Sequence, residues 1–147
     1  MRKKDIKVDK VKKNFYLTLL VFITVLAITY FYTRPEEVVR VLGGNKLQLE
    51  NGKKICLIGV DPHNQTGSFI RKLVEGKSVK LHYDQMRTDS NGYLPAYVYL
   101  TDGTFVNAEV IKSGYARVDT SSPFQYSSEF IGYQLSAQKA KKGIWSN

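Results

Sequence analysis

Residues 89–100 read DSNGYLPAYVYL, a polar turn followed by a run of strand-forming residues. Asn91 and Gly92 tolerate positive φ, and together they are a strong signal for a hairpin turn. The β-branched and aromatic residues of Ala96–Leu100 predict a buried strand. A second turn, Thr101–Thr104, ends this strand, and helical spacing follows it. The segment therefore predicts a turn, a core strand and then a helix.

Four more strands are expected before this segment. Glycine-containing turns and apolar–polar alternation place them at Val38–Leu42, Asn45–Glu50, Lys53–Val60 and Val79–Tyr83. On the third strand we expect Ile55 and Leu57 to share one face, with Cys56 on the other. Residues 61–67 are expected to form a loop.

Helical spacing and terminal signals predict three short helices in this part of the chain. They cover Phe69–Glu75 with Ser68 as N-cap, Val106–Ser113 before Gly114, and Ser127–Lys142 before Gly143. This order of strands and helices suits a mainly β (α+β) fold, a five-stranded Greek-key barrel of the OB type with about three helices.

Residues 15–32 form an uncharged apolar segment, FYLTLLVFITVLAITYFY. As a helix these 18 residues would be about 27 Å long at ~1.5 Å per residue, close to a bilayer core of about 30 Å. The segment therefore predicts one N-terminal transmembrane helix. Aromatic residues stand at both of its ends as expected interfacial anchors: Phe15, Tyr16, Tyr30, Phe31 and Tyr32.

The charges around this segment predict its orientation. Seven Lys and Arg precede Phe15, against Arg34 and Arg40 shortly after the segment, which places the N-terminus in the cytoplasm and the domain outside, in a periplasmic or extracellular space. A cleaved signal peptide and a buried core helix are the alternatives. We expect an uncleaved anchor because residues 28–35 are bulky, unlike a small-residue cleavage site, and three threonines are the only polar residues within the run.

The sequence thus divides into four parts. A basic cytoplasmic tail covers residues 1–14, the transmembrane helix 15–32, a linker 33–37 and the domain 38–147. The tail carries a net charge of +5, so +4 of the total of +9 remains for the rest. This mild excess is weak support for nucleic-acid binding, and an anionic lipid surface accounts more simply for the tail. With Cys56 as the single cysteine, an intramolecular disulfide and a zinc site are excluded.

Three motifs resemble the thermonuclease (staphylococcal nuclease-like) family. They are the pattern GxxLxLxxGxxxxLxGVD at Gly44–Asp61, the string DGTFVNAEVIKSGYARV at Asp102–Val118, and the closing Gly143-Ile144-Trp145. The resemblance covers about residues 38–146 and implies an OB barrel. It also implies a Ca²⁺-dependent endonuclease site, whose positions can be compared one by one.

The resemblance implies metal ligands at Asn45 and Asp61, although Asn45 stands where the family has aspartate. It implies that the family's first catalytic arginine corresponds to the position of Cys56 in this chain and the second to that of Tyr93. The family's VDTPE becomes Val60–Asn64, VDPHN, so His63 or Asn64 stands where the resemblance implies the glutamate that acts on water. Both arginines and the glutamate are thus unmatched, and we expect the metal positions to be vestigial.

We therefore expect a membrane-anchored pseudoenzyme: a thermonuclease-like domain without catalytic activity or cofactor. Its expected role is a binding or structural module, an accessory subunit of a membrane complex. The expected partners are the membrane, through residues 15–32, and other membrane or extracytoplasmic proteins. Abundant tyrosine in the domain suits contact surfaces.

Two other functions stay open on the sequence. One is a Ca²⁺-dependent nuclease with an altered site of Asn45, Asp61, His63 and Arg87. The other is a non-catalytic nucleic-acid binder, which would use phosphate contacts and aromatic stacking. For single residues the structural alternatives are that Cys56 fills the place of a lost arginine and that Asp61 caps a turn before proline.

Overall fold

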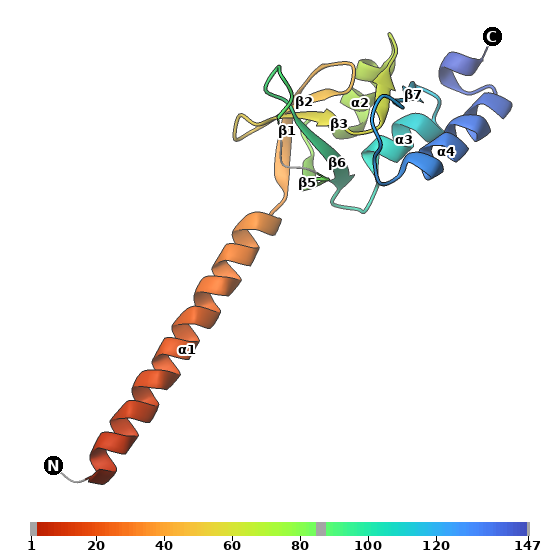
Figure 1. Cartoon of the computed structure of the whole chain (residues 1–147). Helices are drawn as coiled ribbons and strands as arrows, with labels where there is room; N and C mark the ends of the chain where they lie inside the picture. Colours follow the sequence, from red (N-terminus) through yellow and green to blue (C-terminus); the bar gives the residue numbers. More distant parts are fainter. Residues whose placement is uncertain (1–2, 85–87, 147) are drawn as a thin grey trace. The chain divides into compact units, whose positions relative to one another are not determined.

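Figure 1 shows the computed structural model, which describes residues 3–84 and 88–146. The chain divides into two compact units, Met1–Arg34 and Pro35–Asn147. The first unit consists of helix α1, Lys3–Thr33. All other elements belong to the second unit.

Helix α1 contains the stretch Val11–Phe31, which is long and apolar enough to cross a membrane. None of this stretch is buried. Among the expected anchors, the side chains of Phe15, Tyr16, Tyr30 and Phe31 are exposed, and the side chain of Tyr32 lies outside the part that the structure describes.

Five strands of the second unit close into a barrel, as the sequence predicts. The strand order around it is β1-β2-β3-β6-β5, with β3 and β6 parallel and the other described pairs antiparallel. The strands are β1 Glu36–Gly43, β2 Lys46–Leu49, β3 Lys54–Leu57, β5 Ser78–His82 and β6 Leu94–Leu100. Because β1 begins at Glu36, the segment between α1 and the barrel is shorter than the linker expected over residues 33–37.

The barrel interior follows the expected alternation. Leu47 and Leu49 of β2 and Ile55 and Leu57 of β3 are at most 2% exposed, while Cys56 lies on the opposite face and is partly exposed. A fully buried branched side chain contributes roughly 1.5–3 kcal/mol to folding, so this interior explains why the register is strongly specified.

The expected third strand, Lys53–Val60, is wrong as a single strand. It ends at Leu57, turns at Gly59 with a φ of 74°, and continues as β4, Val60–Pro62. Strand β4 pairs with β7, Ala116–Val118, in a separate two-stranded sheet. The split depends on a partner far along the chain, which local patterning does not reveal. The loop expected over residues 61–67 therefore begins only after Pro62.

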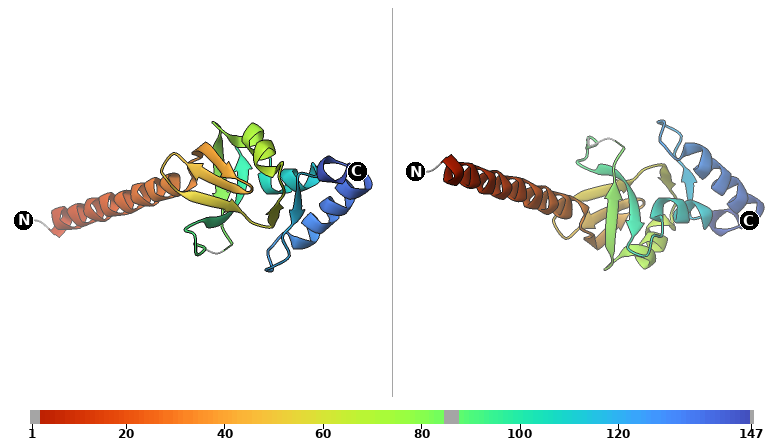
Figure 2. Two further views of the ribbon diagram at one scale, coloured as in Figure 1. Left: turned by 90° about the horizontal axis from the view of Figure 1, so that it is seen from above. Right: turned by 90° about the horizontal axis from the view of Figure 1, so that it is seen from below.

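The helices match the sequence in number and differ at their ends. They are α2 Thr66–Val74, α3 Val106–Lys112 and α4 Ser127–Lys139, followed by the 3-10 turn η1 Gly143–Trp145. Ser68 lies inside α2 and is not its N-cap, because Thr66 Oγ1 accepts the His63 N–H at 2.7 Å and holds the start of the helix. Figures 1 and 2 show α3 between the barrel and α4, in agreement with its packing against β6 and α4.

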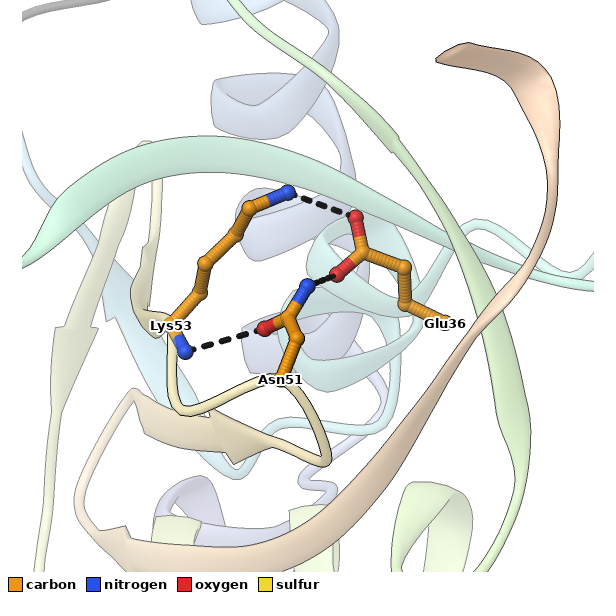
Figure 3. Close-up of polar contacts among 3 residues, drawn as sticks. All are labelled: Glu36, Asn51 and Lys53. Atoms are coloured by element: carbon orange, nitrogen blue, oxygen red, sulfur yellow. Dashed lines mark hydrogen bonds and ion pairs between the residues drawn. The ribbon is translucent and has the colours of Figure 1, made fainter. Parts of the chain in front are cut away.

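A polar cluster holds the start of β1 against the turn between β2 and β3 (Figure 3). The Lys53 ammonium pairs with Glu36 Oε1 at 2.8 Å. Asn51 Nδ2 donates a hydrogen bond to the other carboxylate oxygen of Glu36, and Asn51 Oδ1 accepts one from the Lys53 backbone N–H at 3.0 Å. The expected Asn51-Gly52 turn is thus also the anchor for the strand that leads into the barrel.

The buried side chain of Asn107 joins α3 to β6 and to the turn that follows β3. Its Oδ1 accepts the Val98 N–H at 2.9 Å, and its Nδ2 donates to the carbonyls of Ile58 at 3.0 Å and Ala96 at 3.1 Å. The residue has no exposed surface. A buried polar group is stable only when its hydrogen bonds are satisfied, and here one amide satisfies three backbone groups.

We expect Asn107→Leu to lower the free energy of unfolding by about 3 kcal/mol or more. The Ala96 carbonyl keeps its bond from the Ile58 N–H, but the Val98 N–H and the Ile58 carbonyl lose the partner that Asn107 supplies, at roughly 1–3 kcal/mol for each unsatisfied group. Urea unfolding of the full chain in a neutral detergent, followed by the fluorescence of Trp145, measures the change.

The control is Asn91→Ala, at an exposed asparagine, which should change the free energy of unfolding by less than about 0.5 kcal/mol. An Asn107→Leu variant as stable as the control would contradict the role assigned to the Asn107 amide.

Candidate functional site

A cleft with a volume of about 700 Å³ opens on the outer side of strands β3 and β6. Cys56 of β3 and Pro95 of β6, which are register partners, lie in its wall. The turn after β3 adds Ile58 and Gly59, and the loop after β7 adds Phe124. The cleft therefore lies where β3, β6 and two loops meet.

Three aspartates are the charged residues that line this cleft in the described part of the chain. Asp89 Oδ1 accepts the N–H groups of Asn91 and Tyr93 at 2.9 and 2.8 Å, which stabilises the turn before β6. Asp119 Oδ1 accepts the Ser121 N–H at 2.9 Å. The third aspartate is Asp84, after β5. The cleft is thus acidic on its β5–β6 side and on its β7 side.

The hydroxyl of Tyr97 connects these two sides. It donates to Asp84 Oδ2 at 2.6 Å and accepts the Gln125 N–H at 3.1 Å. The residue is 2% exposed. Burial, followed by the hydrogen bond to Asp84, raises the pKa of Tyr97 well above its ordinary value, so the hydroxyl stays protonated and keeps donating at physiological pH.

Cys56 is partly buried in the wall of the cleft and lies opposite Lys46 of β2. Burial and then the charge of Asp89 raise the pKa of its thiol above the ordinary value, while Lys46 opposes the rise. A thiol with a raised pKa is mostly protonated at neutral pH and is a poor nucleophile. This environment agrees with the structural alternative for Cys56 and does not favour a reactive thiol.

Tyr93 lies beside two lysines that the sequence analysis did not single out. The ammonium nitrogens of Lys46 and Lys54 are 4.7 and 5.9 Å from the centre of its ring. These are distances for cation–π contacts. Positive charge is therefore present near Tyr93, as two point charges around an aromatic ring.

The two expected metal positions come from adjacent backbone segments but have different surroundings. Asn45 Nδ2 donates to the Val60 carbonyl at 2.8 Å, a bond that an aspartate side chain could not donate. Asp61 is exposed on β4, opposite Arg117 of β7. Its side chain makes no turn-capping hydrogen bond within residues 3–84 and 88–146, so the expected turn cap is not observed there.

His63 and Asn64 lie between β4 and α2, and both are exposed. Among the expected site residues, Cys56 lines the cleft. The cleft lining does not include His63 or Asn64, and it does not include Asn45, Asp61 or Tyr93. Arg87 lies outside the described residues. Within those residues no group of three or more His, Cys, Asp and Glu side chains is placed to hold a metal ion.

Sequence reasoning missed the aspartates of the cleft, the lysine pair and Asn107. Lys46 could have been found from the hairpin at Asn51-Gly52, because a tight turn sets the register that places Lys46 opposite Cys56. Asn107 precedes Val110 and Ile111 by three and four residues, which puts it on the apolar face of α3. Asp84 and Asp89 come from the connection between β5 and β6 and Asp119 from the loop after β7, and no local pattern predicts that these two loops share a cleft.

Comparisons with known proteins agree with this fold. The sequence model of the family described as "Staphylococcal nuclease homologue" matches residues 54–147. A protein named "Thermonuclease" from Staphylococcus hyicus is 32% identical over 128 residues, which cover 76% of this chain and 75% of that protein.

Two further relatives cover a smaller part. The "Staphylococcal nuclease domain-containing protein 1" of Schizosaccharomyces pombe is 38% identical over 87 residues, 53% of this chain and 10% of that protein. An uncharacterized protein of Bacillus anthracis is 36% identical over 83 residues, 53% of this chain and 37% of that protein.

We expect Cys56 to react slowly with iodoacetamide at pH 8, at a rate that keeps rising at pH values where an exposed thiol has already levelled off. The reason is that the thiolate reacts, and a raised pKa moves its formation to higher pH. Asp89→Asn keeps the turn-stabilising oxygen and removes the charge, so it should speed the reaction. Lys46→Gln should slow it.

An exposed cysteine in the same chain provides the comparison. The double variant Cys56→Ser, Ser90→Cys has its thiol on an exposed turn and should level off near the ordinary thiol pKa of about 8.5. If Cys56 levelled off at a lower pH than this control, the environment described for Cys56 would be wrong.

Proposed function

The chain belongs to the staphylococcal nuclease family, and on that premise we propose that it is a membrane-anchored, non-catalytic binding module. We further propose that it acts as an accessory subunit of a larger membrane assembly. One observation carries the first proposal: Cys56 and Tyr93 occupy the positions at which the family resemblance implies the two catalytic arginines.

Phosphodiester hydrolysis depends on cationic groups that stabilise the charge of the transition state. A transition-state arginine can contribute on the order of 10³–10⁵ in rate. Cys56 is neutral with a raised thiol pKa, and the Tyr93 ring carries no charge. Two such losses, together with that of the implied glutamate, should leave little chemistry.

The lysines near Tyr93 are poor substitutes for the two arginines. Arginine donates two parallel hydrogen bonds to a phosphate, whereas an ammonium group is a compact point charge. Lys46 and Lys54 also place their charges at the Tyr93 ring, 4.7 and 5.9 Å from its centre. The cleft next to them is lined by three aspartates, which would repel a phosphate backbone.

The metal positions support the same proposal. Asn45 has one negative charge fewer than the implied aspartate, and its amide nitrogen is bonded to the Val60 carbonyl. Its Oδ1 could still act as a neutral ligand for Ca²⁺, together with the Asp61 carboxylate. A single carboxylate makes this a weak site, and we propose that it is vestigial.

The apolar stretch Val11–Phe31 supports the proposed anchor. The excess of Lys and Arg before it supports a cytoplasmic N-terminus and an extracytoplasmic domain. Two residues, Arg34 and Pro35, separate the end of α1 at Thr33 from the start of the barrel at Glu36. The three residue steps from Thr33 to Glu36 span at most about 11 Å, so an anchored domain would work close to the membrane surface, where partners in the same membrane are within reach.

A second candidate function is a Ca²⁺-dependent nuclease with an altered site. The 32% identity to a protein named "Thermonuclease" and the retained Asp61 favour it. The same experiment separates the two functions.

We expect the full chain in neutral-lipid nanodiscs to show no Ca²⁺-dependent cleavage of single-stranded DNA or RNA. Its rate should be at least about 10³-fold below that of the Staphylococcus hyicus thermonuclease, because two charge-stabilising groups are absent. Release of a fluorophore from a quenched oligonucleotide, with Ca²⁺ and with a chelator, measures the rate.

Two variants complete this test. Asn45→Asp, Cys56→Arg, Asn64→Glu and Tyr93→Arg in one chain restore the implied family set, and any cleavage gained by this variant shows that the assay detects activity on this barrel. Asp61→Ala is the second variant. Metal-dependent cleavage by the unaltered chain that disappears in Asp61→Ala would establish the nuclease and reject the non-catalytic role.

A further inference from the structure

We infer that the open side of α4 is an interface between two copies of this chain, which pack their α4 helices side by side and antiparallel. Five exposed residues make up this surface, which we call the α4 outer face: Ser128, Ile131, Gly132, Leu135 and Lys139. None of them lines the cleft beside Cys56, so the inference goes beyond the proposed function and does not depend on it.

Helix α4 has one covered side and one open side. Phe130 and Ala137 are buried, and α4 packs against α3, β7 and η1. Figures 1 and 2 show α3 between α4 and the barrel. Residues seven positions apart share a side of a helix, so Phe130 and Ala137 mark the inner side. The α4 outer face is on the opposite side, where all five of its residues are exposed.

Two large apolar side chains lie on this outer face. Ile131 is 40% exposed and Leu135 is 58% exposed. Because they are four residues apart, they are neighbours on the helix surface. Among the described residues outside α1, Leu135 is the most exposed large hydrophobic side chain. Covering this apolar surface with a partner would be favourable.

Gly132 lies beside these side chains, inside α4, and the described part of the chain gives no reason for a glycine there. Its backbone is helical and not at positive φ. A Cβ added to Gly132 would meet no atom within 4 Å. Glycine inside a helix is less favourable than alanine, and its use is explained where another chain approaches closely. Gly132 thus points to a partner outside the chain.

The α4 outer face is complementary to itself. In an antiparallel pair with its two-fold axis between residues 133 and 134, position 132 of each copy lies opposite position 135 of the other. The Leu135 side chain of one copy then packs beside Gly132 of the other, and the contact occurs twice. Two-fold dimers use the same surface patch on both copies, and this property favours a second copy over a different protein.

The charges along α4 favour the same antiparallel arrangement. Glu129 lies in the first turn and Lys139 in the last turn, and both are exposed. The pairing brings Lys139 of one copy next to Ser128 and Glu129 of the other. Neither ion pair of the described residues involves Glu129 or Lys139. Opposite charges therefore meet at both ends of the contact, whereas a parallel pair would bring like charges together.

The polar group next to Gly132 does not oppose burial. The Ser136 hydroxyl donates to the Gly132 carbonyl at 2.9 Å, so this donor stays satisfied when the face is covered. The contact is small, because α4 has 13 residues and is about 20 Å long at ~1.5 Å per residue. We therefore expect reversible association, which attachment of both copies to one membrane would strengthen by raising their local concentration.

The test is disulfide cross-linking of the full chain in phosphatidylcholine proteoliposomes, with Cys56→Ser so that only introduced cysteines react. One version carries Ser128→Cys and another carries Lys139→Cys. In a mixed sample the antiparallel pair places these two cysteines opposite each other, while each stays about 16 Å along the helix from its own counterpart. Since a disulfide needs Cα atoms within about 7 Å, we expect at least about tenfold more cross-linked dimer in the mixed sample than in either version alone.

Two substitutions test the packing of Leu135 on Gly132. Gly132→Gln adds a helix-favouring side chain where the fold leaves open space, so the variant should fold, and it fills the space that the other copy needs. Leu135→Ser removes the apolar contact. We expect each to lower cross-linking of the mixed sample at least about fivefold. The matched control, Ser68→Gln, places the same glutamine on an exposed position of α2 and should change it less than about twofold. Trp145 emission verifies folding.

Three results would overturn the inference. The first is a yield in the mixed sample no higher than that of a mixture of Lys139→Cys with Ser90→Cys, whose cysteine is on an exposed turn. The second is equal cross-linking in mixed and single-version samples, which would indicate parallel or random contacts. The third is a yield in Gly132→Gln or Leu135→Ser equal to that of the Ser68→Gln control. The first result would leave the α4 outer face to a different protein and reject the second copy.

Discussion

The buried amide of Asn107 is the interaction on which the rest of the domain depends. It lies in α3 with no exposed surface and bonds to the backbone of β6 at Ala96 and Val98 and to Ile58 in the turn after β3. Parallel strands β3 and β6 have no short connection that could hold them together. The two strands pair directly with each other, and the amide adds a side-chain link from α3 to β6 and to the turn after β3, where Ile58 lines the cleft.

From this link the geometry of the candidate site follows. The turn at Gly59 redirects the chain from the barrel into β4, and Phe124 covers that turn. Tyr97 then ties the two loops beside the cleft to each other. The shell of the barrel thus preserves a cleft, while its charges are those of Asp84, Asp89 and Asp119. The proposed non-catalytic role rests on this combination of preserved shape and altered charge.

Local patterns were sufficient to predict most of the barrel. Alternation identified the buried residues of β2 and β3, and the turn at Asn51-Gly52 predicted their pairing. The division of Lys53–Val60 into β3 and β4 was missed, because it requires pairing with Ala116–Val118 more than fifty residues later. The start of α2 was missed for a similar reason, since Thr66 also donates to the Tyr115 carbonyl at 2.5 Å.

The candidate site was less predictable than the fold. The family resemblance located Cys56 and Tyr93, but the charges around them come from Lys46 across the hairpin and from Asp89 in a loop. Which loops share a cleft is a tertiary property, so the acidic lining became visible only in three dimensions.

The most direct measurement of the central claim is calorimetric titration of Ca²⁺ into the full chain in neutral-lipid nanodiscs, with oligothymidylate present. The claim is that the barrel keeps its shape without the charges needed to hold Ca²⁺ and a phosphate backbone together. It predicts that this titration gives no saturable heat beyond that measured when Ca²⁺ is titrated into the oligonucleotide without the protein. Saturable one-to-one Ca²⁺ binding that disappears in Asp61→Ala would contradict it.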